Sequence, residues 1–194
     1  MQSTGLAPGT YFVRVRRAQG YGSYNVRAQL EAVTIAGDKE PNDTHEHAQV
    51  ISLGQEFTGL LGYGNVEGTD TEDWYKFTTT KPGTIKVAVQ AEETLKIYLN
   101  LYDVNGSRQL AADTGSPQAS TRSVQSTGLA PGTYFVRIRR AQGYGSYNVR
   151  PQLEAVTIAG DKEPNDTHKQ AQVIPLGQEF TGLLGIRKCR RYRH

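Results

Sequence analysis

The chain is nearly free of cysteine and has no long apolar run. Its 194 residues include one cysteine, Cys189, which excludes an intramolecular disulfide and a zinc site built from several cysteines. No stretch approaches the ~20 apolar residues of a membrane-spanning helix, and Met1 is not followed by the basic start and apolar run of a signal peptide. Phosphate-binding loops and dinucleotide fingerprints are also absent, so neither a nucleotide-dependent enzyme nor a membrane span is expected.

Glycine and tyrosine are abundant instead, with 21 glycines and 11 tyrosines against 5 phenylalanines. Runs of alternating apolar and polar residues predict strands, and Asn105-Gly106 is a hairpin-turn pair. The runs cover residues 11–16, 56–61, 74–80, 85–89, 95–101 and 147–153. About eight strands in ~120 residues predict an all-β sandwich or barrel. One short helical turn is predicted after Asp43 or Thr44, either of which can cap it.

An internal repeat organises the chain. Residues 2–62 reappear as residues 125–185 with a constant offset of 123, and 56 of the 61 positions are identical. The predicted division has four parts. These are the C-terminal piece of a preceding repeat at 1–36, one complete domain at 37–157, the N-terminal piece of a following repeat at 158–185, and an aberrant tail at 186–194.

The near-identity of the two copies creates a competition. Residues 2–33 and 125–156 can claim the same place in a sheet, so units built from 2–123 or 63–185 are alternatives to 37–157. The matching segments Thr-Ile-Ala-Gly on both sides of the middle unit favour 37–157. Leftover strands would then expose unpaired edges, which promotes strand swapping and aggregation.

The tail after Gly185 departs from the repeat. A one-base shift in the reading of the codons for residues 63–71 reproduces all nine residues from Ile186 to His194. We therefore interpret the tail as a shifted reading of the repeat, and not as a basic arm for nucleic acid. The tail holds Cys189 and five of the 22 basic residues, and the remaining basic residues are outnumbered by the 19 acidic ones. The formal charge of +3 is thus no evidence for an anionic partner.

Two acidic clusters are the strongest candidates for a site. Their oxygen-bearing residues are Asp38, Glu40, Asn42 and Asp43 in the first cluster, and Asp70, Glu72 and Asp73 in the second. Alternating oxygen ligands on an irregular loop suit a hard cation such as Ca²⁺, which takes 6–8 oxygens. Neither cluster has the spacing of an EF-hand loop. A turn with a helix cap and a solvated hairpin tip are the alternative interpretations.

The chain resembles the bacterial pre-peptidase C-terminal domain, a family that includes the collagen-binding domains of clostridial collagenases. The motifs that carry the resemblance are Glu40-Pro-Asn-Asp-Thr44, Gly59-Leu-Leu-Gly62, Asp73-Trp-Tyr-Lys-Phe77, Leu99-Asn-Leu-Tyr-Asp103, Leu129-Ala-Pro-Gly-Thr-Tyr134 and Gly145-Ser-Tyr147. The resemblance implies a jelly-roll-like antiparallel β-sandwich without catalytic activity, located outside the cell or on its surface.

The resemblance also implies a calcium site. The ligands would be Asp38, Glu40, Asn42, Asp43, Asp70, Asp73 and the backbone carbonyl of Tyr147. The metal would fix the N-terminal segment against the sandwich and stabilise the folded state. No catalytic residue is predicted, because the serines lack a nucleophile elbow and a partner histidine, and a histidine beside the acidic segment is expected to be exposed to solvent.

The predicted function is a spacer or accessory module of a larger extracellular protein such as a peptidase, with neighbouring identical repeats and that parent protein as partners. The alternative is an adhesion module that binds a glycan or a collagen-like matrix polymer through a sheet face lined by arginine and tyrosine. Its binding residues would be Arg137, Arg139, Tyr144 and Arg150, with Tyr98 beside them.

Overall fold

A computed structural model describes residues 10–29, 37–62, 70–116, 119–157, 162, 164–165 and 167–182. Its nine strands all lie between Gln49 and Ala155. They are β1 (Gln49–Val50), β2 (Phe57–Leu61), β3 (Glu72–Thr79), β4 (Gly83–Ala91), β5 (Lys96–Tyr102), β6 (Gln109–Asp113), β7 (Thr121–Leu129), β8 (Gly132–Gln142) and β9 (Gly145–Ala155). The predicted tail at 186–194 lies outside the described residues.

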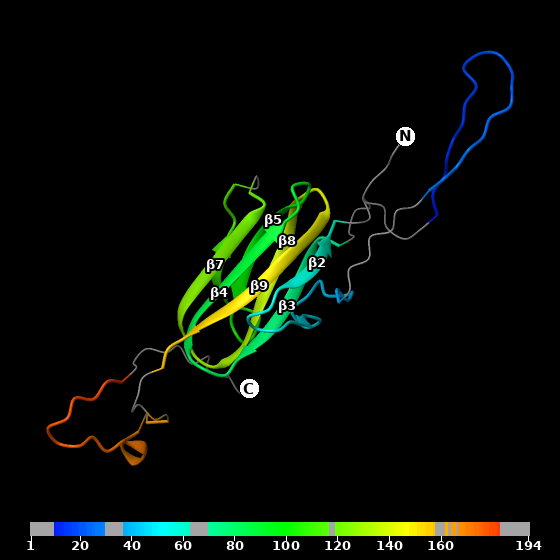
Figure 1. Ribbon diagram of the computed structural model, residues 1–194. Coiled ribbons are helices and arrows are strands. Elements are labelled where there is room, and N and C mark those ends of the chain that lie inside the picture. Colours follow the sequence, from blue (N-terminus) through cyan, green and yellow to red (C-terminus); the bar gives the residue numbers. More distant parts are fainter. Residues whose placement is uncertain are drawn as a thin grey trace.

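The strands form two sheets that pack face to face (Figure 1). The five-stranded sheet has the order β1-β3-β8-β5-β6, and the four-stranded sheet has the order β2-β9-β4-β7. All strand pairs are antiparallel except β1 with β3. The predicted all-β sandwich is therefore confirmed. The strands β8 and β9 lie in the interior of their sheets, each with a neighbour on both sides.

The core lies between the sheets because apolar residues alternate along the strands. In β4, Ile85, Val87 and Val89 are buried while Ala88 and Gln90 are exposed. The five-stranded sheet contributes Tyr75, Phe77, Leu99, Leu101, Tyr134, Val136 and Ile138 to the same core. The Asn105-Gly106 turn joins β5 to β6 as predicted, with Gly106 at a φ of 67° that glycine adopts without strain.

The predicted strand at residues 11–16 is wrong. Residues 10–29 have no strand and lie apart from the sheets, as the blue loop in Figure 1 shows. Residues 133–152, which are nearly the same sequence, occupy β8 and β9. A strand needs partners, and those that suit this sequence are already paired with the other copy.

The predicted helical turn after Asp43 is also wrong. Residues 43–47 form turns, with His47 N–H bonded to the Thr44 carbonyl at 3.1 Å. The second copy of this segment does form one turn of 3₁₀ helix, η1 (His168–Gln170), preceded by Thr167. No helix among the described residues is long and apolar enough to cross a membrane.

Candidate metal site

The acidic residues come together at one end of the sandwich. We use the name acidic cluster for Asp38, Glu40, Asn42, Asp70 and Asp73. One ligand atom each from Glu40, Asp70 and Asp73 lies within 4.8 Å of the others, the separation expected of groups that share a metal ion. Among the described residues of the chain, this is the group of acidic side chains that could hold a cation.

Two segments far apart in the sequence meet here because hydrogen bonds from backbone N–H groups of β2 and β3 join them. Trp74 N–H of β3 donates to the Asn42 carbonyl at 2.8 Å, and Leu60 N–H of β2 donates to Asp38 Oδ2 at 2.8 Å. The N-terminal segment, residues 38–42, is thereby fixed to one strand of each sheet. Within it, Asn42 N–H donates to Glu40 Oε2 at 3.1 Å, which turns the carboxylate toward the cluster.

Two buried tyrosine hydroxyls form hydrogen bonds with carboxylates of the acidic cluster. Tyr75 OH of β3 lies 3.2 Å from Asp38 Oδ1 and 2.6 Å from Tyr147 OH of β9. Tyr147 OH in turn donates to Asp73 Oδ2. Gly59 of β2 makes room for both rings, since a Cβ there would overlap the two hydroxyls. The chain of contacts connects both sheets to the acidic cluster.

The site leaves buried oxygen atoms without a hydrogen-bond donor. Asp73 is fully buried, and its Oδ1 has no hydrogen-bond partner, as is also true of Asn42 Oδ1. Buried polar atoms are nearly always paired, so these two oxygens are exceptions that can each accept a further partner. Asp70 adds a second sign of constraint, because its φ of 41° lies in the left-handed region that residues other than glycine rarely adopt.

The electrostatics favour a positive ligand. Burial raises the pKa of the Asp73 carboxyl well above its ordinary range, against the hydrogen bond from Tyr147. The negative charges of Asp38, Asp70 and Glu40 raise this pKa further. Burial also raises the pKa values of Asp38 and Glu40. Such a cluster is stable only when a proton neutralises one of its carboxylates or a cation compensates their negative charge.

The predicted ligands do not all lie in the group of three carboxylates. Asp43 is exposed and lies outside the group of three carboxylates. Tyr147 reaches the cluster through its hydroxyl. The predicted role of its backbone carbonyl stays a prediction. Sequence reasoning missed Tyr75, which looks like an ordinary apolar position in the alternating strand β3. The pattern that could have identified Tyr75 is its position two residues after Asp73, because residues two apart lie on the same side of a strand.

The predicted arginine and tyrosine face is only partly correct. Arg137 and Arg139 lie on the outer side of the five-stranded sheet, where Arg137 covers Trp74 at 5.6 Å and Arg139 covers Tyr98 at 5.1 Å. Arg150 lies on the other sheet, because β9 pairs with β2 and β4 and not with β8. The expectation that Arg150 shares this face is therefore wrong.

Tyr144 lies in the turn between β8 and β9, at the end of the sandwich. We use the name arginine–aromatic face for Trp74, Tyr98, Tyr102, Arg137 and Arg139. Glu72 also lies on it and forms an ion pair with Arg137.

The fold and the site together define a β-sandwich module with an acidic cluster at one end. Residues 71–140 match the family of the bacterial pre-peptidase C-terminal domain. The resemblance predicted from the sequence is thus confirmed over these residues of the sandwich. No curated protein matches the chain.

Solved structures with a similar arrangement include three that align over nearly their full length. The pre-peptidase C-terminal domain of collagenase from Bacillus anthracis has 19% identity and a TM-score of 0.44, covering 59% of this chain and 99% of that one. PliG, a periplasmic inhibitor of g-type lysozyme from Salmonella Typhimurium, has 16% identity and a TM-score of 0.34, covering 55% and 99%. PliG from Aeromonas hydrophila has 13% identity and a TM-score of 0.31, covering 54% and 99%.

Proposed function

We propose that this protein is a non-catalytic accessory module of a larger extracellular protein, such as a peptidase, and that Ca²⁺ bound at the acidic cluster stabilises its fold. The observation that carries the metal proposal is the convergence of Glu40, Asp70 and Asp73 within 4.8 Å beside buried, unpaired oxygens of Asn42 and Asp73. All of these donors are oxygens, as a hard cation prefers.

The stabilisation follows from where the cluster lies. The N-terminal segment reaches the sheets through Asp38 and Asn42, both of which belong to the acidic cluster. A cation that binds only the folded state stabilises it by mass action. It also removes the repulsion between the buried Asp73 and its less buried carboxylate neighbours, so the segment and the sheets become one cooperative unit.

The test is thermal unfolding of the chain after treatment with a chelator, with and without added Ca²⁺. At a hundredfold excess over Kd, binding adds about 2.7 kcal/mol and raises the midpoint by about 10 °C. Asp73→Asn should abolish this shift, because it removes the buried carboxylate. Glu154→Gln, an exposed carboxylate on the other sheet, is the matched control and should keep it. An unchanged midpoint in the wild type contradicts calcium binding.

The accessory role has its own test, independent of the metal. The nucleotide sequence on both sides of this reading frame should encode further 123-residue repeats or a peptidase. It should also show the one-base shift proposed for residues 186–194. Flanking genes without repeats or any extracellular protein would contradict the accessory role.

A second candidate function is recognition of an acidic polymer by the arginine–aromatic face. The stacking of Arg139 on Tyr98 at 5.1 Å supports it, because arginine and tyrosine are enriched in binding hot spots. Saturable binding of a sulfated or carboxylated glycan that Arg139→Ala weakens at least about tenfold would support this function. If Arg150→Ala binds the glycan as well as the wild type does, the binding is assigned to the five-stranded sheet.

A further inference from the structure

The turn between β5 and β6 holds the chain's one asparagine–glycine pair, Asn105-Gly106. Asn105 is exposed to solvent, whereas Gly106 is buried. Glycine has no side chain to shield its backbone nitrogen, and the side-chain carbonyl carbon of the preceding asparagine can reach that nitrogen by closing a five-membered ring. The pair can therefore react with itself in addition to forming the turn.

The reaction is the deamidation of asparagine, and its atoms balance with water as the only co-reactant. The backbone nitrogen of Gly106 attacks Cγ of Asn105 and forms a C–N bond. The side-chain amide leaves as ammonia and takes the proton of the Gly106 N–H. Water then opens the cyclic imide at one of its two carbonyls. One product is aspartate, and the other is isoaspartate, in which the main chain runs through the former side chain.

Hydrogen bonds hold the Gly106 nitrogen in place in the folded turn. Its N–H donates to the Asp103 carbonyl at 2.9 Å. The side chain of Asp103, which is 5% exposed, accepts the N–H groups of Asn105 at 3.3 Å and Arg108 at 3.2 Å. The nitrogen can turn toward Cγ of Asn105 only when its own bond to Asp103 opens. The rate of the reaction then follows the population of the open turn.

The ring of His45 covers the same turn. A Cβ at Gly106 would lie 2.7 Å from Cδ2 of this ring, so the ring lies directly against the glycine. The His45 ring packs in turn against Trp74 of β3, with 5.8 Å between ring centres, and against Phe135 of β8, with 6.2 Å. Movement of Gly106 toward the ring is blocked, and this restrains the opening of the turn.

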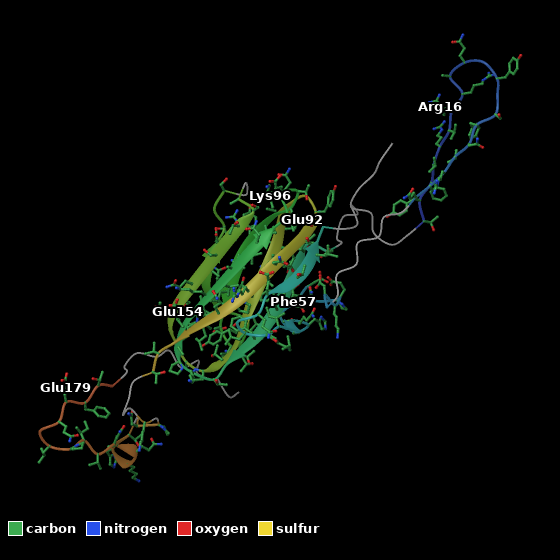
Figure 2. All side chains as sticks on the ribbon, in the orientation of Figure 1. Arg16, Phe57, Glu92, Lys96, Glu154 and Glu179 are labelled. Carbon is green, nitrogen blue, oxygen red and sulfur yellow. The ribbon has the colours of Figure 1, made fainter. Side chains whose placement is uncertain are left out.

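We propose that Asn105 is a deamidation site of the folded chain, and that the His45 ring restrains the reaction by limiting how often the turn opens. Every other asparagine in the chain is followed by valine, leucine or aspartate, whose side chain hinders attack by the backbone nitrogen. Asn25 provides an internal comparison. It is exposed in the loop that carries Arg16 in Figure 2, but Val26 follows it.

The two products affect the turn differently. Both add a negative charge two positions after the buried Asp103 carboxylate, and like charges at close range repel each other. The isoaspartate product also lengthens the main chain between β5 and β6 by one methylene. The isoaspartate form therefore has two reasons to open the turn, whereas the variant Asn105→Asp has only the added charge.

The test follows the conversion in the full chain at physiological temperature and mildly alkaline pH. Peptide mass spectrometry locates the loss of the amide, and an isoaspartate methyltransferase labels the isoaspartate product. We expect Asn105 to convert while Asn25 keeps its amide. His45→Ala should convert about fivefold faster or more, because lost packing raises the population of the open turn. His45→Phe keeps a ring over the turn, and His47→Ala changes an exposed neighbour, so both should convert at the wild-type rate.

Conversion of Asn25 as fast as that of Asn105 overturns the site. Equal rates in wild type and His45→Ala overturn the role of the ring, as does slower conversion in both His45 variants, which would make the imidazole a base that promotes the reaction. Wild type in urea needs no variant to fold: it should convert faster than the folded chain, and an equal rate overturns the restraint.

The isoaspartate form is compared with Asn105→Asp after separation from the incubated wild type. It should unfold at a lower temperature than Asn105→Asp, because only the isoaspartate form carries the extra methylene. Equal midpoints would overturn the effect of the longer main chain on the turn.

Discussion

At the scale of single residues, the acidic cluster determines how the protein responds to pH. Burial raises the pKa values of Asp38, Glu40 and Asp73, so without a cation each takes up a proton more readily in the folded than in the unfolded chain. Their unfavourable contribution is absent below the ordinary carboxyl values near 4. It appears as the pH rises through the raised native values.

We therefore predict opposite pH dependences with and without metal. Metal-free protein should become more stable as the pH falls from 7 toward about 5, because the folded state binds more protons. With saturating Ca²⁺ the sign should reverse, since protons compete with the cation for the same oxygens. Urea unfolding at several pH values in chelator and in Ca²⁺ measures both slopes. Parallel slopes in the two series would contradict the assignment of these residues to the site.

A second residue-scale prediction concerns Gly59. A methyl group there would overlap the hydroxyls of Tyr75 and Tyr147, which are buried and cannot move away freely. Gly59→Ala should lower the free energy of unfolding by about 1–3 kcal/mol, as overpacking does. Gly22→Ala is the control, because nothing lies within 4 Å of its added methyl group. Equal effects of the two substitutions in chemical unfolding would contradict the close approach.

At the scale of elements, Arg122 connects β7 to the loop after β6. The side chain is 3% exposed and donates to Asp113 Oδ1 at 2.7 Å and to the Ser116 carbonyl at 2.5 Å. Burial alone would raise the pKa of Asp113, but hydrogen bonds from Arg122 and the Ser123 N–H hold it below the ordinary value. The loop is thereby fixed to the edge strand.

Arg122→Ala should lower the free energy of unfolding by about 2 kcal/mol at neutral pH, because it removes charge-assisted hydrogen bonds between a buried guanidinium and a partly exposed carboxylate. The difference from wild type should shrink as the pH falls through the lowered native pKa of Asp113. Arg108→Ala provides the control, since Arg108 is half exposed and its pair with Asp103 at 3.5 Å should contribute under about 1 kcal/mol. Urea denaturation at pH 7 compares the two, and equal losses would exclude the buried pair.

The elements also show what the sequence could and could not predict. Alternation identified the strands around Ile85 and Val149, because burial of one sheet face requires it. The same alternation around Val13 predicted a strand that the structure does not contain. The pattern alone cannot distinguish two nearly identical segments. Which copy enters the sheets depends on how much chain connects it to the other strands. Arg150 was misplaced for a related reason, since sequence order does not say which sheet a strand joins.

At the scale of the whole molecule, the two copies of one sequence have different environments. Residues 10–29 hold four exposed arginines that belong to no strand, whereas their counterparts lie in β8 and β9. Arg14, Arg16, Arg17 and Arg27 correspond to Arg137, Arg139, Arg140 and Arg150. Proteases need an extended, accessible backbone, which hydrogen-bonded interior strands do not offer.

Limited trypsin digestion should therefore cut the first set of arginines and spare the second. Mass spectrometry of the early products should find a resistant fragment that begins after Arg27 or Lys39 and retains all of β8 and β9. Digestion in urea is the control, because unfolding should make both sets equally sensitive. Early cleavage at Arg137 or Arg150 under native conditions would contradict the arrangement.

The contacts at the acidic cluster also set an order of events when the protein is made. Asp73 meets Tyr147 across 74 positions of the chain, and Asp38 meets Tyr75 across 37. Because a ribosome or a secretion channel releases the N-terminus first, the carboxylates emerge long before the tyrosine that supports Asp73. Tyr147 can support Asp73 only after β9 has been released. The contact of Asp73 with Tyr147 can thus form only when nearly the whole sandwich has been released.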